Sequence, residues 1–112
     1  MDARHVWKPR EVIAALNALG FTENRARGKG DHIFFLRYCV CQGGKTITAK
    51  TIVDAGSKQI PFKTMAHILD AIALTDEQLR SAWQGKFSST DYDRYLLTIP
   101  RARLLPFALR QR

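Results

Sequence analysis

Residues 31–53, DHIFFLRYCVCQGGKTITAKTIV, decide the fold because they predict a β-hairpin. The first part, residues 31–41, is rich in the aromatic and β-branched side chains that are typical of strands. Gly43 and Gly44 then lie between this run and a second strand-like run over residues 45–53, and paired glycines favour a tight turn. The stretch therefore predicts two long antiparallel strands that are adjacent in the sheet.

The residues before the hairpin predict a helix and a short strand. The segment KPREVIAALNALG, residues 8–20, has a proline at Pro9, which suits the first helical turn, and a glycine at Gly20, which suits the position just past a helix end. Its apolar residues recur at helical spacing: Val12, Ala15, Leu16 and Leu19. FTENRAR, residues 21–27, then alternates as a short first strand does, and GKG, residues 28–30, is a turn.

The residues after the hairpin predict a second long helix. PFKTMAHILDAIAL, residues 61–74, begins with Pro61 and has an apolar stripe formed by Phe62, Met65, Leu69 and Ile72. The order is thus α-β-β-β-α, an α+β fold in which the two helices cover one face of a three-stranded antiparallel sheet and leave the other face open. We expect this unit to span residues 1–74.

Residues 75–112 predict a helical C-terminal extension. Thr75 to Gln78 match the S/T-x-x-E/Q capping box, and the helix that follows is expected to end at Gly85. Residues 88–99, SSTDYDRYLLTI, predict another capped helix that Pro100 stops. The final segment, residues 101–112, contains four arginines and no acid.

The composition describes a folded and strongly basic chain. Of its 112 residues 46% are hydrophobic and 10% aromatic, which is enough for a core and excludes a disordered tail. The formal net charge of +8 predicts a polyanionic partner: RNA, DNA, an acidic protein or an acidic membrane surface. No apolar run approaches the roughly 20 residues that span a bilayer, and the N-terminus lacks a signal-peptide pattern. We therefore expect a cytoplasmic chain that does not enter a membrane.

Four residues that often carry chemistry have structural interpretations here. Cys39 and Cys41 would lie on the same face of one strand, where a disulfide is poorly placed, and no second ligand pair lies nearby. We interpret both as small core residues. Trp7 and Trp83 could stack on bases, but we expect them to anchor helices to the core.

His32 is the one histidine at the start of a predicted strand, and its role has two interpretations. It is either a structural strand residue or a catalytic group, and it lies close in sequence to the basic residues Arg25, Arg27, Lys29 and Arg37. Alternation places His32 on the same face as Phe34, Leu36 and Tyr38, and does not say which face the helices cover. Asp31 lies on the other face, so it is not expected to orient the imidazole.

If the polyanionic partner is RNA, the residue types around His32 are those that metal-free cleavage of RNA needs. RNA carries its own nucleophile, the 2′-hydroxyl, and a histidine with a reference pKa of about 6.5 serves as base or acid at neutral pH. Basic side chains can hold the phosphate and the charge that develops on it. One histidine supplies only one proton transfer, and the sequence does not identify the second group. No His, Asp or Glu cluster has metal-ligand spacing.

Residues 7–74 resemble the HicA toxins of bacterial toxin–antitoxin pairs. The resemblance is carried by the segments KPREVIAALNALGF, RARGKGDHIFF, KTITAK and KQIPFKTMAHILDAI. In that family the first helix ends in Gly-Phe, a Gly-[Ser/Asp/Asn]-His motif starts a strand, and a hairpin leads to a helix entered through I-x-x-x-T. The matching positions here are Gly20-Phe21, Gly30 to His32, Gly43-Gly44, and Ile60 to Thr64.

The resemblance implies a fold like that of double-stranded-RNA-binding domains, and a small ribonuclease that cleaves mRNA and is blocked by a HicB-type antitoxin. It implies that His32 is the catalytic residue, with Gly28 and Gly30 shaping the turn before it. We expect RNA contacts from basic residues near the motif and at the second long helix: Arg25, Arg27, Lys29, Arg37 and Lys63. No metal or other cofactor is expected.

Two alternatives stay open on the same fold. The first is a non-catalytic RNA-binding module, although duplex readers usually carry a lysine cluster at the start of the last helix and only Lys58 and Lys63 are available here. The second is a protein-interaction module in which the basic surface and the extension recognise an acidic partner.

Overall fold

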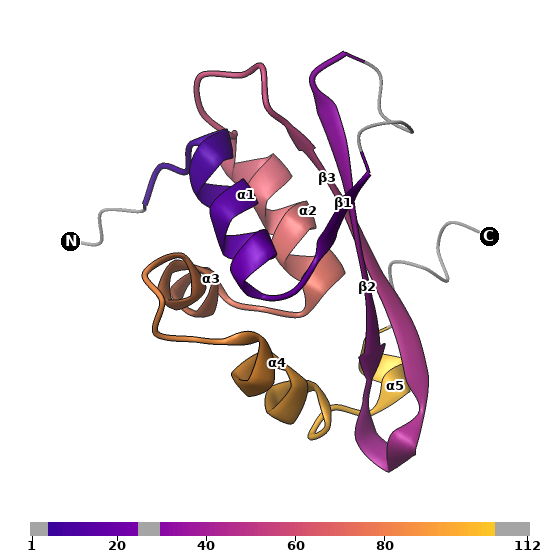
Figure 1. Cartoon of the computed structure of the whole chain (residues 1–112). Helices are drawn as coiled ribbons and strands as arrows, with labels where there is room; N and C mark the ends of the chain where they lie inside the picture. Colours follow the sequence, from indigo (N-terminus) through magenta and orange to yellow (C-terminus); the bar gives the residue numbers. More distant parts are fainter. Residues whose placement is uncertain (1–4, 25–29, 105–112) are drawn as a thin grey trace.

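The structure is a computed structural model that describes residues 5–24 and 30–104 (Figure 1). Its elements follow one another as α1 (Pro9–Ala18), β1 (Thr22–Asn24), β2 (His32–Val40), the 3-10 turn η1 (Gln42–Gly44), β3 (Thr46–Asp54), α2 (Phe62–Ile72), α3 (Asp76–Trp83), α4 (Ser89–Leu96) and α5 (Arg101–Leu104). The predicted α+β order, a helix followed by three antiparallel strands and then helices, is confirmed. No helix in these two ranges is long and apolar enough to cross a membrane.

The sheet has the order β1-β2-β3, with both neighbouring pairs antiparallel. The long pair β2–β3 runs in continuous register from His32 opposite Asp54 to Val40 opposite Thr46. Side chains alternate between faces along a strand, and the odd-numbered residues of these two strands are mostly buried, whereas the even-numbered ones are exposed or half-buried. We call the even-numbered side the open face. Helices α1 and α2 lie against the other side (Figure 1).

The Gly-Gly turn closes the hairpin as a single turn of 3-10 helix. Gly43 and Gly44 have φ of +78° and +74°, a region that residues with a Cβ rarely adopt. The Cys41 N–H donates to the Lys45 carbonyl at 2.7 Å, and the Gly44 N–H donates to the Cys41 carbonyl at 3.0 Å. The predicted hairpin is confirmed, and its glycines are required by this turn.

The core combines residues of the first 74 positions with residues of the extension. Leu79, Tyr92 and Leu96 belong to the same buried cluster as Trp7 and Phe35. The Tyr92 hydroxyl donates to the Ile72 carbonyl at 2.9 Å, and the Gln42 N–H donates to the Ile99 carbonyl at 3.0 Å. The described part of the extension, residues 75–104, therefore shares one hydrophobic core with the first 74 residues.

The residues interpreted as structural are mostly placed as predicted. Trp7 is buried, and its indole Nε1–H donates to Asp76 Oδ1 at 2.7 Å. Cys39 and Cys41 are buried and free. Burial raises the pKa of the Cys39 thiol above its usual range. Trp83 differs, because it is 37% exposed and its ring lies beside Trp7 and His5 on the helical side.

The capping box at the start of α4 makes stability depend on pH. The Ser88 N–H donates to Asp91 Oδ2 at 2.9 Å, the Asp91 N–H donates to Ser88 Oγ at 3.1 Å, and the backbone bond from Ser88 lowers the pKa of Asp91 below its usual 3.8. A lowered folded-state pKa gives stability that is present above the unfolded value and is lost as the pH falls through the folded value.

We expect Asp91→Ala to lower the free energy of unfolding at neutral pH, with a difference from the parent that shrinks below about pH 3.8. Urea denaturation at a series of pH values measures this. A difference that stays constant from neutral to acid pH would contradict a role for the Asp91 charge.

Candidate active site

His32 is the first residue of β2 and its side chain is exposed on the open face. The residue two positions earlier, Gly30, has φ of +59°, so the turn into the strand uses a conformation that favours glycine. Residue alternation alone did not determine which face of the sheet the helices cover. In the structure, His32 lies on the face that α1 and α2 do not cover. The predicted residues Arg25, Arg27, Gly28 and Lys29 lie outside the described residues.

Asp54 is the residue directly opposite His32 on the neighbouring strand. The adjacent pair, Asp31 and Ala55, is joined by a backbone hydrogen bond, in which the Ala55 N–H donates to the Asp31 carbonyl at 2.8 Å. Since bonded and non-bonded pairs alternate in an antiparallel ladder, His32 and Asp54 form a non-bonded pair, whose Cβ atoms lie about 4.5–5.5 Å apart. A carboxylate and the imidazole therefore project side by side from the open face.

The Asp54 carboxylate is held in place by its own turn. Its Oδ1 accepts a hydrogen bond from the Gly56 N–H at 3.0 Å, and its backbone carbonyl accepts one from Ser57 Oγ at 3.2 Å. Two carboxylate oxygens offer about four acceptor positions, so this turn fixes Asp54 and leaves it able to accept a further bond. Asp54 is a candidate for orienting His32.

Asp31 has a different position, against the backbone of the same turn. A Cβ placed on Gly56 would meet Asp31 Cγ at 2.8 Å, so the Asp31 side chain lies close against this turn. Asp31 thus packs on the turn, in agreement with the expectation that it does not orient His32. Asp54 was not among the predicted site residues, because the second strand-like run was expected to end at residue 53. Its signal was the hairpin itself, because pairing outward from a turn centred on Gly43 puts residue 54 opposite residue 32.

Arg37 is not brought to His32, although both belong to β2. The two residues are an odd number of positions apart, so their side chains leave the strand on opposite faces. The Arg37 side chain is 9% exposed; its Nε donates to the Leu19 carbonyl at 2.7 Å, and its Nη2 donates to Ser89 Oγ at 2.8 Å. The same Nη2 lies 2.9 Å from Asp93 Oδ1. The structure thus gives Arg37 a packing role in place of the predicted phosphate contact.

The charge of Arg37 is maintained in this position. Burial alone would lower its pKa, but hydrogen bonds with Cys39 and Asp93 outweigh burial and leave the pKa raised. The guanidinium also lies over the Tyr92 ring, 4.9 Å from its centroid. A permanent cation therefore joins the inner face of the sheet to the end of α1 and to α4.

Lys63 is exposed in the first turn of α2, in the helical layer, whereas His32 projects from the other side of the sheet. The structure does not place this predicted RNA contact on the open face. Within the described ranges, no three His, Cys, Asp or Glu side chains are grouped so that they could hold a metal ion.

A hollow of about 440 Å³ surrounds the free edge of β3. Most of its lining comes from the inner side of the sheet and from α2 and α4, with Cys39, Ile72 and Tyr92 among these residues. At the β3 edge the hollow reaches the open-face residues Phe34, Leu36, Lys50 and Ile52. The edge is partly occupied where the chain returns to it, because Arg101 Nε donates to the Thr46 carbonyl at 2.9 Å. The open face therefore has a catalytic candidate at one end, and the hollow reaches this face at the β3 edge.

Comparison with protein-family models, with curated proteins and with solved structures finds no match to this chain.

Proposed function

We propose that the chain is a metal-independent endoribonuclease of the HicA toxin kind, which cleaves mRNA in the cytoplasm and is neutralised by a HicB-type antitoxin. The observation that carries the proposal is the exposure of His32 on the open face, at a Gly-Asp-His turn into β2 and opposite Asp54. The resemblance of residues 7–74 to the family supports it, and so does the α-β-β-β-α order that double-stranded-RNA-binding domains share.

The proposed reaction uses the RNA's own nucleophile. The 2′-oxygen attacks the neighbouring phosphorus, the bond from phosphorus to the 5′-oxygen breaks, and the products are a 2′,3′-cyclic phosphate and a 5′-hydroxyl. His32 transfers one of the two protons, either from the 2′-hydroxyl or to the leaving 5′-oxygen. Asp54 accepts a hydrogen bond from the imidazole and so fixes its orientation and the nitrogen that carries the proton. Basic residues near the motif neutralise the charge on the phosphate.

The role of Asp54 predicts a loss of turnover without a loss of binding. We expect Asp54→Asn to lower kcat about tenfold or more with little change in KM, because a misoriented imidazole slows the proton transfer but does not alter the RNA contacts. Steady-state cleavage of a fluorogenic RNA measures both constants.

Two variants serve as controls for Asp54. Asp54→Glu keeps the carboxylate and should recover part of the lost kcat, and Asp31→Asn removes the other nearby acid and should have the smaller effect. The orienting role is contradicted if Asp31→Asn lowers kcat as much as Asp54→Asn, or if Asp54→Asn acts on KM alone.

The toxin assignment is tested in cells. Expression of this chain alone should arrest growth, His32→Ala should relieve the arrest, and co-expression of the neighbouring reading frame should rescue growth with the parent chain. Growth arrest that persists in the His32→Ala strain would contradict a toxin that acts through cleavage.

A non-catalytic RNA-binding module is the second candidate function. It is favoured by the open face itself, which combines exposed apolar and basic side chains whether or not His32 reacts. Salt-sensitive RNA binding without any cleavage would select this candidate.

A further inference from the structure

The open face carries an exposed aromatic side chain that the catalytic proposal does not use. Tyr38, in the middle strand of the sheet, is 84% exposed, and Ile52 and Val40 are each 43% exposed. The solvated face of an antiparallel sheet usually carries polar residues, and neighbouring exposed apolar residues mark binding surfaces. The open face is therefore a candidate binding surface.

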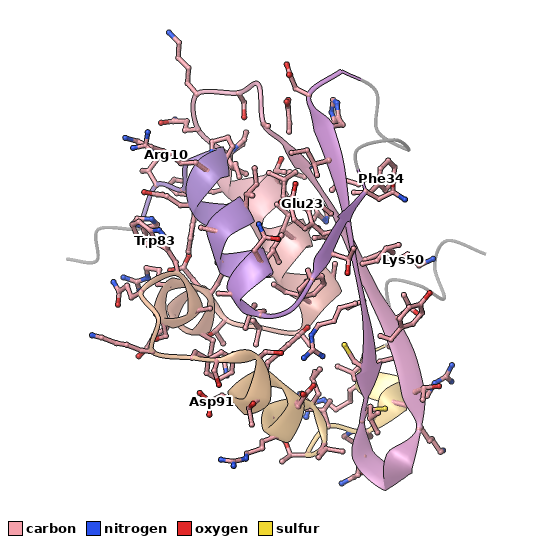
Figure 2. All side chains as sticks on the ribbon, viewed as in Figure 1. Arg10, Glu23, Phe34, Lys50, Trp83 and Asp91 are labelled. Carbon is pink, nitrogen blue, oxygen red and sulfur yellow. The ribbon has the colours of Figure 1, made fainter. Side chains whose placement is uncertain are left out.

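The face carries cations as well as apolar side chains. Lys50 lies opposite Leu36 in the register, and Figure 2 shows Phe34 and Lys50 projecting to the side of the sheet away from α1 and α2. Arg101 adds a second cation at the β3 edge, where its bond to the Thr46 carbonyl holds it. Among the described residues of β2 and β3 on this face, Asp54 is the only acid. With a chain net charge of +8, this pattern favours a polyanion.

The side chains of the surface suit flat groups. Phe34, Leu36 and Ile52 form a group of apolar side chains at the open-face end of the hollow, and Lys50 adds a cation beside them. Tyr38 follows Leu36 on the same face of β2, and its ring is exposed to solvent. Single-stranded nucleic acids bind to such surfaces, because their bases stack on aromatic rings while basic residues follow the phosphates. In a duplex the base faces are stacked on one another, so they are not available to Tyr38.

We propose that the open face is a binding track for single-stranded RNA, in which a base stacks on Tyr38 and Lys50 contacts a phosphate. Tyr38 is six residues from His32, a distance of about 20 Å along the strand. An RNA strand stacked on Tyr38 can therefore follow β2 and place a phosphodiester at His32. The choice of RNA rests on the proposed function, whereas the choice of a single strand rests on the exposed ring.

The test measures RNA binding in the His32→Ala background, so that cleavage does not interfere. The probe is a fluorescein-labelled oligouridine, and a matched probe replaces its bases by abasic sites. We expect Tyr38→Ala to weaken binding to oligouridine about tenfold, which is the size of one base–aromatic contact. Tyr38→Phe keeps the ring and should bind as the parent does. With the abasic probe, Tyr38→Ala and the parent should bind equally.

Lys50 is tested by the salt dependence of the same binding. Lys50→Gln should make the slope of log affinity against log salt shallower by about 0.7, the value for one phosphate contact on a single strand. Lys86→Gln removes the same charge from an exposed position in the segment between α3 and α4 and should leave the slope unchanged.

The outcomes separate this track from the catalytic proposal. If the parent chain does not cleave RNA but the Tyr38 and Lys50 effects are observed, the track stands and the nuclease proposal fails. Equal binding of Tyr38→Ala and its parent to oligouridine overturns the track even if His32 cleaves RNA. Tighter binding of duplex than of single-stranded RNA also overturns it. If a protein partner binds in place of RNA and Tyr38→Ala abolishes that complex, the face is a protein interface and the track is wrong.

Discussion

Replacing His32 by alanine is expected to lower kcat/KM for RNA cleavage by about 10²–10⁴-fold, the contribution of one positioned acid or base. The substitution removes the group proposed to transfer a proton at the scissile phosphate. Because His32 is exposed at the start of β2, its loss creates no cavity in the core. The free energy of unfolding should therefore stay within about 0.5 kcal/mol of the parent.

His5→Ala is the matched control for this experiment. The His5 side chain is 24% exposed, but it packs against Trp7 and Trp83 on the helical side and does not line the hollow at the β3 edge. Its substitution should leave the cleavage rate unchanged. Cleavage that survives His32→Ala while the fold is intact would remove His32 from the mechanism.

Arg37→Met is expected to cause the largest loss of stability, about 2–4 kcal/mol in the free energy of unfolding. Methionine keeps part of the apolar stem but makes none of the charged hydrogen bonds to the Leu19 carbonyl, Ser89 and Asp93. These bonds join the end of α1 and the start of α4 to the sheet. The neighbouring Gly20 is adapted to the same arrangement, because a Cβ there would lie 2.9 Å from Ser89 Oγ and 3.2 Å from Arg37 Nε.

Urea denaturation measures the loss in the free energy of unfolding caused by Arg37→Met. Asp93→Asn, which removes only the ion pair, is the variant with which this loss is compared. Asp93 is 54% exposed, so water screens its ion pair and the loss should be below about 1 kcal/mol. Arg37→Met protein that is still folded should retain its affinity for RNA, because position 37 lies on the face opposite His32. A strong loss of RNA affinity with unchanged stability would restore the phosphate-binding role predicted from the sequence.

The parts of the fold that were predictable from the sequence are those that local patterns determine. Helix α1 begins at Pro9 and is followed by Gly20 with φ of +93°, and the hairpin closes on Gly43 and Gly44, as the turn residues indicate. The capping box at Thr75 forms with the expected reciprocal bonds. In each of these cases the deciding interaction joins residues within about four positions of one another, and short motifs describe such contacts well.

The features of the fold and the site that the sequence did not predict depend on contacts between residues that are distant in the sequence. Arg37 was predicted to bind RNA because it lies close to His32 in sequence, but its hydrogen bonds reach Leu19 and Ser89, far from it in the chain. Only the register of β2 and β3 shows that Asp54 is paired with His32. The capping and stop residues of the extension predicted its helices, but did not indicate that Tyr92 would belong to the same core as Trp7 and Phe35.

The proposed cleavage of RNA through the 2′-hydroxyl, without a metal, is tested most directly by one measurement. The purified protein is incubated in EDTA with a single-stranded RNA and, separately, with the same sequence in which every nucleotide is 2′-deoxy. We predict that the RNA is cut to fragments ending in a 2′,3′-cyclic phosphate and that the deoxy strand remains intact. Equal cutting of both strands, or an intact RNA strand, would contradict the claim.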